Sequence, residues 1–170
     1  MTLGPLAVLV VKSGVSLGGL SDGDRLLALA VCAGSLPPGP GTTEAQANGC
    51  LKRCLANEAA FLATDHVELR RWLVDAGWWR RDAAGQRYQR VPLDDLAGRL
   101  RAAAEALQPL DLATWVADRR AADQERRLRR REQWAATKPW RQGCPAARAR
   151  PVPWLGRVPE RRTWRSGGSR

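Results

Sequence analysis

The chain contains one histidine, one tyrosine, one phenylalanine, one methionine and four cysteines in 170 residues. Because His66 is the single histidine, any Ser-His-Asp or Cys-His catalytic apparatus would depend on that one imidazole. No glycine-rich phosphate loop follows a strand, since Ser13-Gly14 and Gly18-Gly19 lack the lysine and the spacing of a P-loop. We therefore expect no catalytic residues and no cofactor, and we expect that the protein is not an enzyme.

The cysteines form no C-x-x-C knuckle. Cys50 and Cys54 lie one helical turn apart, and together with Cys32 and His66 they could offer three thiolates and one imidazole to zinc. The alternative is a set of buried or half-buried thiols, and this is the interpretation that we adopt. No metal and no disulfide are expected in a chain of cytosolic character.

Long apolar runs are also missing. Leu6–Val11 is apolar, but no basic segment precedes it, and it is far shorter than the ~20 residues that cross a bilayer. We expect no membrane contact and a cytoplasmic location. Residues 1–20 are predicted to be an N-terminal extension, either loose or with a short strand at Leu6–Val11 that pairs with the hairpin described next.

The stretch Asp65–Val91 predicts a helix that leads directly into a β-hairpin. Asp65 and Glu68 have the spacing of a capping box, and Gly77 stands where the helix must end. Two short runs flank the turn residues 82–85, which is a hairpin signal. The apolar residues at helical spacing are Leu69, Trp72, Leu73 and Ala76.

Two earlier helices fit the same plan. One is capped by Ser21 or Asp22 and ends before the proline-rich residues 37–40, and the other is capped by Thr42 or Thr43. Three helices followed by a basic hairpin predict a winged helix-turn-helix-like domain over residues 21–92. The expected fold is mainly α with a small β-hairpin.

The same residues resemble a known family. The segment 40–92 is similar to a bacterial domain family of unknown function whose members occur alone or fused behind the winged-helix domain of transcriptional regulators. The resemblance implies a DNA-associated or regulatory role and no reaction. The residues that carry it are Thr43-Glu44, Asn48, Leu51, His66, Leu69-Arg70-Arg71, Leu73-Val74-Asp75, Gly77, Arg81-Asp82, Tyr88 and Arg90.

Positive charge is concentrated at one end of the chain. Residues 1–118 carry twelve basic and thirteen acidic side chains, a net charge of −1, whereas residues 119–170 carry sixteen basic and four acidic ones, a net charge of +12. The preference for arginine, with 25 arginines against three lysines, is explained equally well by a GC-rich genome. The uneven distribution indicates a polyanionic partner, with nucleic acid as the first candidate.

Two further helices and a tail follow the hairpin. Residues 93–136 predict one helix with an apolar face over Leu93–Leu107 and a second, strongly basic helix that Asp111 caps. The Leu93–Leu107 face is expected to pack either on the winged-helix domain or against a second copy in a homodimer. Residues 137–170 are rich in Arg, Pro and Trp, which predicts a disordered tail whose indoles either stack on unpaired bases or merely reflect composition.

The predicted function is DNA binding or transcription-associated regulation, with double-stranded DNA as partner. In this interpretation the Asp65–Ala76 helix enters the major groove while hairpin arginines touch the phosphate backbone. The alternative is a protein-interaction module whose basic tail binds RNA or other polyanions without specificity. The candidate nucleic-acid-binding residues are Glu68, Arg70, Arg71, Arg80, Arg81, Arg87, Arg90, Arg126, Arg127, Arg129, Arg130 and Arg131.

Overall fold

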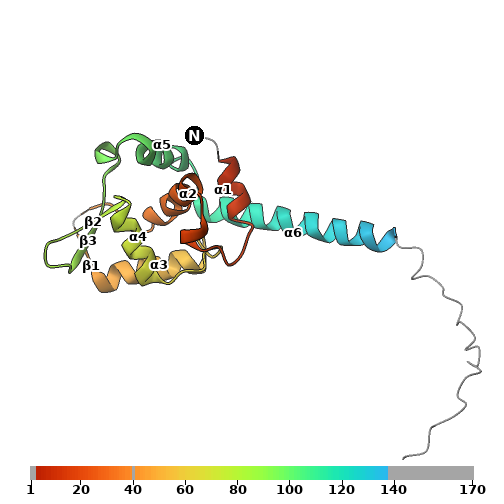
Figure 1. Cartoon of the computed structure of the whole chain (residues 1–170), viewed down its shortest axis with the longest axis horizontal. Coiled ribbons are helices and arrows are strands. Elements are labelled where there is room, and N and C mark those ends of the chain that lie inside the picture. Colours follow the sequence, from red (N-terminus) through yellow and green to blue (C-terminus); the bar gives the residue numbers. More distant parts are fainter. Residues whose placement is uncertain (1–2, 40, 138–170) are drawn as a thin grey trace, which may run out of the picture. The chain divides into compact units, whose positions relative to one another are not determined.

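A computed structural model describes residues 3–39 and 41–137, and within them six α-helices accompany one small antiparallel sheet (Figure 1). The prediction of a mainly α protein with a small β element is thus confirmed. The chain divides into two units, residues 1–131 and 132–170, and the described part of the second is residues 132–137. The elements are α1 (Gly4–Leu9), the 3₁₀ helix η1 (Leu17–Gly19), α2 (Asp22–Ala33), β1 (Thr42–Thr43), α3 (Glu44–Ala56), α4 (His66–Asp75), β2 (Trp79–Arg81), β3 (Arg87–Arg90), the 3₁₀ helix η2 (Leu93–Asp95), α5 (Gly98–Leu107) and α6 (Leu112–Ala136).

Side chains cap the starts of α2 and α3. Ser21 Oγ accepts a hydrogen bond from the Asp24 N–H at 3.2 Å, which satisfies one of the free amides of the first turn of α2. Thr43 and Gln46 form a full capping box at α3, with each side chain accepting from the backbone N–H of the other residue. Both predicted helix starts are confirmed.

The predicted cap of α4 is half right. The Asp65 carboxylate accepts from the N–H groups of Val67 and Glu68 at 2.7 and 2.8 Å. The Glu68 carboxylate, however, does not reach back to the backbone of Asp65, because it accepts a hydrogen bond from Thr64 Oγ1 at 2.8 Å instead. Gly77 ends the helix with φ +80°, the left-handed conformation that its position predicted.

The sheet has one strand more than the predicted hairpin. Its order is β1-β3-β2, with β3 antiparallel to both neighbours. Strand β1, which was not predicted from the sequence, places Thr42 opposite Tyr88. Directly after it, the Glu44 N–H donates to the carbonyl oxygen of Gln86 at 3.1 Å. The start of α3 is therefore fastened to the hairpin.

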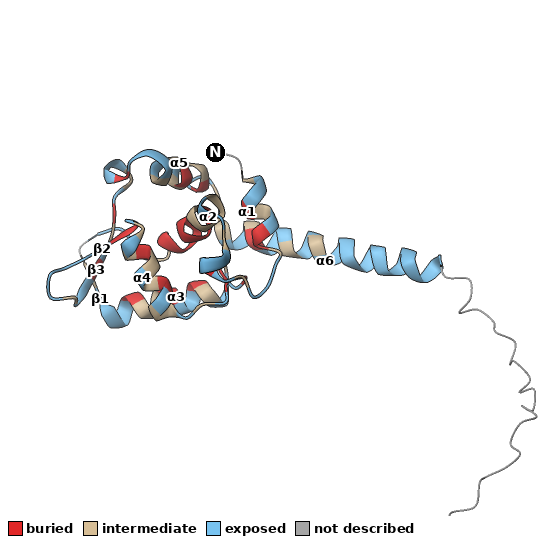
Figure 2. Cartoon of the chain, in the orientation of Figure 1, coloured by how far each residue is buried: buried red, intermediate tan, exposed pale blue. Residues whose placement is uncertain are grey.

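Helix α2 is the centre of the hydrophobic core and contacts α1, α4 and α5. Its residues 27–33 are all buried, as expected for a helix that is covered on several sides (Figure 2). Trp79 is 1% exposed, and its Nε1 donates a hydrogen bond to the carbonyl oxygen of Ala33 at 3.2 Å. This bond joins the first hairpin strand to the C-terminal end of α2.

The N-terminal prediction is wrong. Residues 4–9 form α1 rather than a strand, and Leu6, Leu9 and Val10 are at most 2% exposed. This i, i+3, i+4 spacing gives a helix one buried face. A strand would place Leu6, Val8 and Val10 on the same face, yet Val8 is 56% exposed. The segment belongs to the core and is not an extension of it.

Helix α5 begins later than predicted. Residues 93–95 form η2, Leu96 is extended, and α5 starts at Gly98, whose φ is +53°. Ala103 and Leu107 are buried, and α5 packs on α2. The first of the two predicted alternatives is therefore the observed one, and the buried side chains of this face are unavailable to a second copy.

The remaining predictions concern the cap of α6, the tail and the membrane. Asp111 caps α6, because its carboxylate accepts from the backbone N–H and the hydroxyl of Thr114. The predicted disordered tail lies outside the described residues apart from Thr137. Within residues 3–39 and 41–137, no helix combines the length and the apolar character needed to cross a membrane.

Burial of α1 leads to a stability prediction. We expect Leu6→Ala to lower the free energy of unfolding by about 2–5 kcal/mol, because the removed methyl groups leave a cavity in the core. The control is Val8→Ala on the exposed side of the same helix, with an expected change of less than about 0.5 kcal/mol. Urea denaturation followed by circular dichroism measures both, and equal values would contradict the placement of α1.

Candidate nucleic-acid interface

Asp82 organises the turn of the β2–β3 hairpin. Its N–H donates to the carbonyl oxygen of Arg87 at 3.0 Å, and its carboxylate accepts from the backbone N–H groups of Gln86 and Arg87 at 2.8 and 3.2 Å. Gly85 adopts φ +73° to close the turn. The hydrogen bond from the Arg87 amide is the main cause that holds the pKa of Asp82 below its ordinary value.

Three of the four hairpin arginines face solvent. Arg80, Arg81 and Arg87 are exposed, whereas Arg90 is half-buried on the same side of β3 as the buried Tyr88. Arg80 forms an ion pair with Asp95 at 3.3 Å, but both side chains are well exposed, so the pair is weak. The exposed guanidinium groups are therefore accessible to an anion, and Arg90 is less so.

Arg70 does not fit the predicted role in nucleic-acid binding. Its side chain is only 11% exposed and forms an ion pair with Glu44 at 2.7 Å. It also donates to the Asn48 amide oxygen at 2.5 Å, and its guanidinium lies 4.9 Å from the centroid of the Tyr88 ring. The physical reason is that Arg70 lies on the side of α4 that faces α3, which holds Glu44 and Asn48, and β3, which holds Tyr88. Arg70 is therefore a structural residue.

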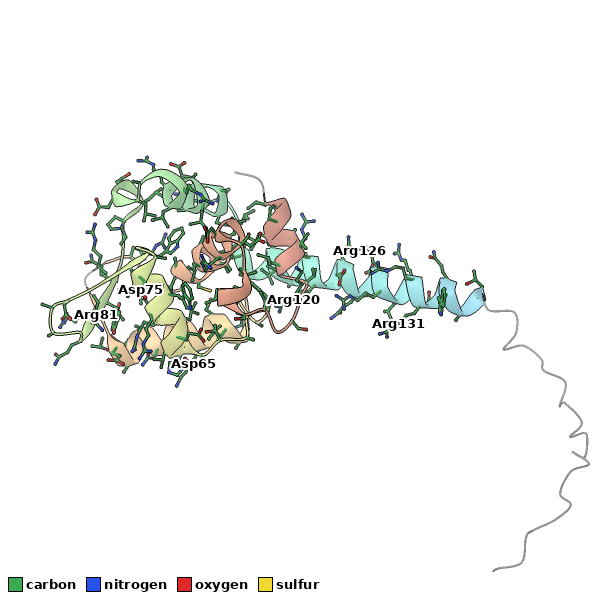
Figure 3. The ribbon with its side chains drawn as sticks, viewed as in Figure 1. Asp65, Asp75, Arg81, Arg120, Arg126 and Arg131 are labelled. Atoms are coloured by element: carbon green, nitrogen blue, oxygen red, sulfur yellow. The ribbon has the colours of Figure 1, made fainter. Side chains whose placement is uncertain are left out.

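The exposed face of α4 is acidic. Asp65, Glu68, Arg71 and Asp75 are its exposed charged side chains, which gives three carboxylates against one guanidinium. Figure 3 labels Asp65 and Asp75 toward opposite ends of this helix. Glu68 is also engaged with Thr64. Since phosphates repel carboxylates, this face opposes the predicted insertion of α4 into the major groove.

Arg71 of α4 and Arg81 of the hairpin contribute to one surface hollow. With Arg70, Asp75 and Tyr88 they line a shallow hollow of about 200 Å³. Glu44 balances the charge of Arg70, so Arg71 and Arg81 face a single carboxylate, that of Asp75. One arginine of α4, the helix predicted to enter the major groove, and one arginine of the hairpin thus line the same concave, cationic surface.

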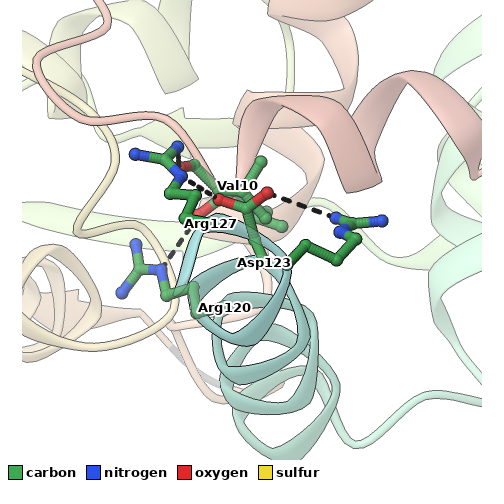
Figure 4. A network of polar contacts seen from close by, with 6 residues as sticks. Val10, Arg120, Asp123 and Arg127 are labelled. Atoms are coloured by element: carbon green, nitrogen blue, oxygen red, sulfur yellow. Dashed lines mark hydrogen bonds and ion pairs between the residues drawn. The ribbon is translucent and has the colours of Figure 1, made fainter. Parts of the chain in front are cut away.

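Two arginines of α6 bond to backbone carbonyl groups at the end of α1, and of these only Arg127 was predicted to bind nucleic acid. Arg120 Nε donates to the carbonyl oxygen of Val10 at 2.9 Å, and Arg127 Nη2 donates to that of Val11 at 3.4 Å (Figure 4). The last carbonyl groups of a helix have no partner within the helix, and arginine side chains can satisfy them. Sequence reasoning missed Arg120, because nothing local connects it to residue 10.

Asp123 holds this side of α6 together. Its carboxylate accepts from Arg127 Nε at 2.5 Å and from Arg126 Nη2 at 3.3 Å. Loss of water contact acts to raise the pKa of Asp123, but the hydrogen bond and charge of Arg127, followed by those of Arg126, prevail and lower it. The exposed arginines beyond are Arg129, paired with Glu125 at 3.4 Å, and Arg130 and Arg131, which have no ion-pair partner among the residues described.

The thiols lie apart from these arginines. Cys32 and Cys54 are buried, and Cys50 is half-buried. The hydrogen bond with Cys54 and then burial raise the pKa of Cys32. His66 is the first residue of α4. In residues 3–39 and 41–137, no set of three or more His, Cys, Asp or Glu side chains is arranged to hold a metal ion.

Comparison with known proteins finds a family match for one part of the chain. Residues 21–90 match a family described as "Uncharacterized protein conserved in bacteria (DUF2087)". This segment runs from the cap of α2 to the end of β3, and so begins well before the resemblance noted from residue 40. No curated protein and no solved structure matches the chain. The three central helices and the sheet are therefore similar to a bacterial domain of unknown function.

The geometry of the turn predicts a pH dependence. A lowered pKa means that Asp82 stabilises the folded hairpin above the carboxyl's ordinary pKa, and that this contribution is lost as the pH falls through the lowered value. We expect the amide resonances of Gln86 and Arg87 to titrate with a midpoint below the ordinary aspartate range in NMR spectra. Asp82→Asn should abolish this inflection, and a midpoint at or above the ordinary range would refute the turn geometry.

The contacts of Arg70 predict a difference from its neighbour. We expect Arg70→Met to lower the free energy of unfolding by about 1–3 kcal/mol, because hydrogen bonds to a charged group are lost in a half-buried place. Arg71→Met removes the same charge from an exposed position and should change it by less than about 0.5 kcal/mol. Thermal or urea unfolding compares the two variants, and similar losses would show that Arg70 is no more structural than Arg71.

Proposed function

We propose that the protein binds double-stranded DNA through a winged-helix-like domain in which the hairpin leads the contact. The order α2, α3, α4 and then β2–β3 supports this, since it is the helix-helix-helix-hairpin order of a winged helix. The observation that carries the proposal is the convergence of Arg71 and Arg81 around one hollow. Two guanidinium groups from different elements suit a phosphate group, which they can contact through forked hydrogen bonds.

The distribution of charge favours the hairpin over α4 as the main contact. Arg80, Arg81 and Arg87 are exposed on the hairpin, and Asp95 is the acid that pairs with one of them. The exposed face of α4 has a negative balance, so Arg71 would touch a phosphate at its edge while the rest of the helix stays away from the groove. Contacts of this kind position a protein on DNA and read little sequence.

Helix α6 adds to this attraction. Arg130 and Arg131 are exposed, and Arg129 is held only in an exposed ion pair that a phosphate can replace. Arg126 is also exposed, although its partner Asp123 is largely buried. Figure 3 shows Arg126 and Arg131 on α6 and Arg81 at the hairpin. Such residues raise affinity for any polyanion and make it depend on salt. The function that we assign is therefore binding, without a chemical reaction.

A second candidate is a protein-interaction module with a polyanion-binding tail. The acidic face of α4 favours it, because a basic protein partner would complement Asp65, Glu68 and Asp75. Under this alternative the hairpin arginines contribute nothing to DNA affinity. The basic residues after 137 would instead provide the affinity for nucleic acid, and they would bind single-stranded and double-stranded forms alike.

A paired substitution separates the two candidates. For Arg71→Gln/Arg81→Gln in the full chain, we expect duplex affinity to fall by at least about tenfold, roughly 1.4 kcal/mol. The slope of log affinity against log salt should drop by about two units, since two phosphate contacts are lost. Fluorescence anisotropy with labelled duplex and single strands at several salt concentrations measures both quantities.

The matched control is Arg99→Gln/Arg101→Gln, which removes the same charge from exposed positions on α5. It should leave duplex binding within about twofold of the unmodified protein. If both double variants weaken binding equally, charge alone matters and the hairpin has no special role. Unchanged binding of duplex and single strands by Arg71→Gln/Arg81→Gln would favour the tail. Failure of the unmodified protein to bind duplex DNA would refute the proposal.

A further inference from the structure

A cavity of about 310 Å³ lies between α2, the base of the hairpin and α5. Its wall is mostly apolar, with Ala33 from α2, Leu96 after η2, and Ala104 and Leu107 from α5. Pockets for small molecules are commonly of this kind, and this volume is at the low end of their range of ~300–1,000 Å³. The cavity therefore suits a small molecule with an apolar body.

One donor in the wall has no acceptor. Trp78 lines the cavity and is 3% exposed, and its Nε1 is buried without a hydrogen-bond partner among the described residues. The neighbouring Trp79 differs, since its Nε1 donates to the carbonyl oxygen of Ala33. Native proteins rarely leave a buried N–H group without a partner, because the group has lost its water. A ligand that supplies an acceptor satisfies this donor once the indole turns toward the cavity.

The wall of the cavity also includes one cationic residue. Arg90 lines the cavity and is the ladder partner of Trp79, one position along from Trp78, whose carbonyl oxygen accepts from the Val91 N–H at 3.0 Å. Arg90 is half-buried and has no ion-pair partner among the described residues. No Asp or Glu is present in the wall. The positive charge of Arg90 is therefore available to an anion inside the cavity.

We propose that this cavity binds a small apolar monocarboxylate. The carboxylate accepts hydrogen bonds from Trp78 Nε1 and from the guanidinium of Arg90, and the hydrocarbon part lies against Leu96, Ala104 and Leu107. A neutral ligand would leave the charge of Arg90 unused, and a doubly charged phosphate would lose its water among apolar groups with one cation to compensate it. This inference is independent of DNA binding.

Octanoate is the probe, and NMR of the indole N–H groups of the full chain is the measurement. Trp78→Phe identifies the Trp78 signal by its loss. We expect octanoate to shift the Trp78 indole resonance and to leave that of Trp79 in place, since the latter already has its acceptor. Acetate, which carries the charge without the apolar body, should have no effect, and 1-octanol should bind at least about tenfold more weakly than octanoate.

Two variants complete the test. Arg90→Gln should weaken octanoate binding by at least about tenfold and leave 1-octanol binding unchanged, while Arg80→Gln, at an exposed position of β2, should change neither. Ala104→Met should fill the cavity and abolish both, with its melting temperature showing that it folds. Equal binding of octanoate and 1-octanol, full octanoate affinity in Arg90→Gln, or an unmoved Trp78 signal would each overturn the proposal.

Discussion

The guanidinium of Arg70 connects α4 with α3 and with the sheet in the central domain, residues 21–90. It belongs to α4, forms an ion pair with Glu44 at the start of α3, and lies over the ring of Tyr88 in β3. Strand β1, directly before Glu44, pairs with the same Tyr88. One side chain thus sets how two helices and the sheet meet. The position of the hairpin relative to α4, and with it the hollow that Arg71 and Arg81 line, depends on this contact.

Local features of the sequence explain which parts of the fold were predictable. The Asp65 cap, the left-handed Gly77 and the Asp82–Gly85 turn are each fixed by atoms within a few residues, so the sequence pattern is enough to find them. Strand β1 and the inward direction of Arg70 depend instead on partners from distant segments. Two threonines give almost no strand signal, and an arginine one place from a buried leucine looks the same in sequence whether it faces solvent or a neighbouring helix.

The arginines differ in the groups that they contact, and this difference is not visible in the sequence. Arg70, Arg120 and Arg127 are engaged with groups of the chain itself. Arg90 lines an apolar cavity, while Arg81 and Arg87 of the same hairpin face solvent. Because side chains alternate along β3, its outer residue Arg87 and its inner residue Arg90 serve different surfaces. A molecule seated against Arg90 would therefore touch the base of the strand that presents Arg87.

The bond from Arg120 to the carbonyl of Val10 spans 110 residues of sequence. A ribosome adds about 5–20 residues each second, so Arg120 is made roughly 5–20 s after Val10. During that interval the carbonyl group of Val10 lacks its arginine partner and stays open to water. The C-terminal end of α1 is thus completed only once α6 has been made.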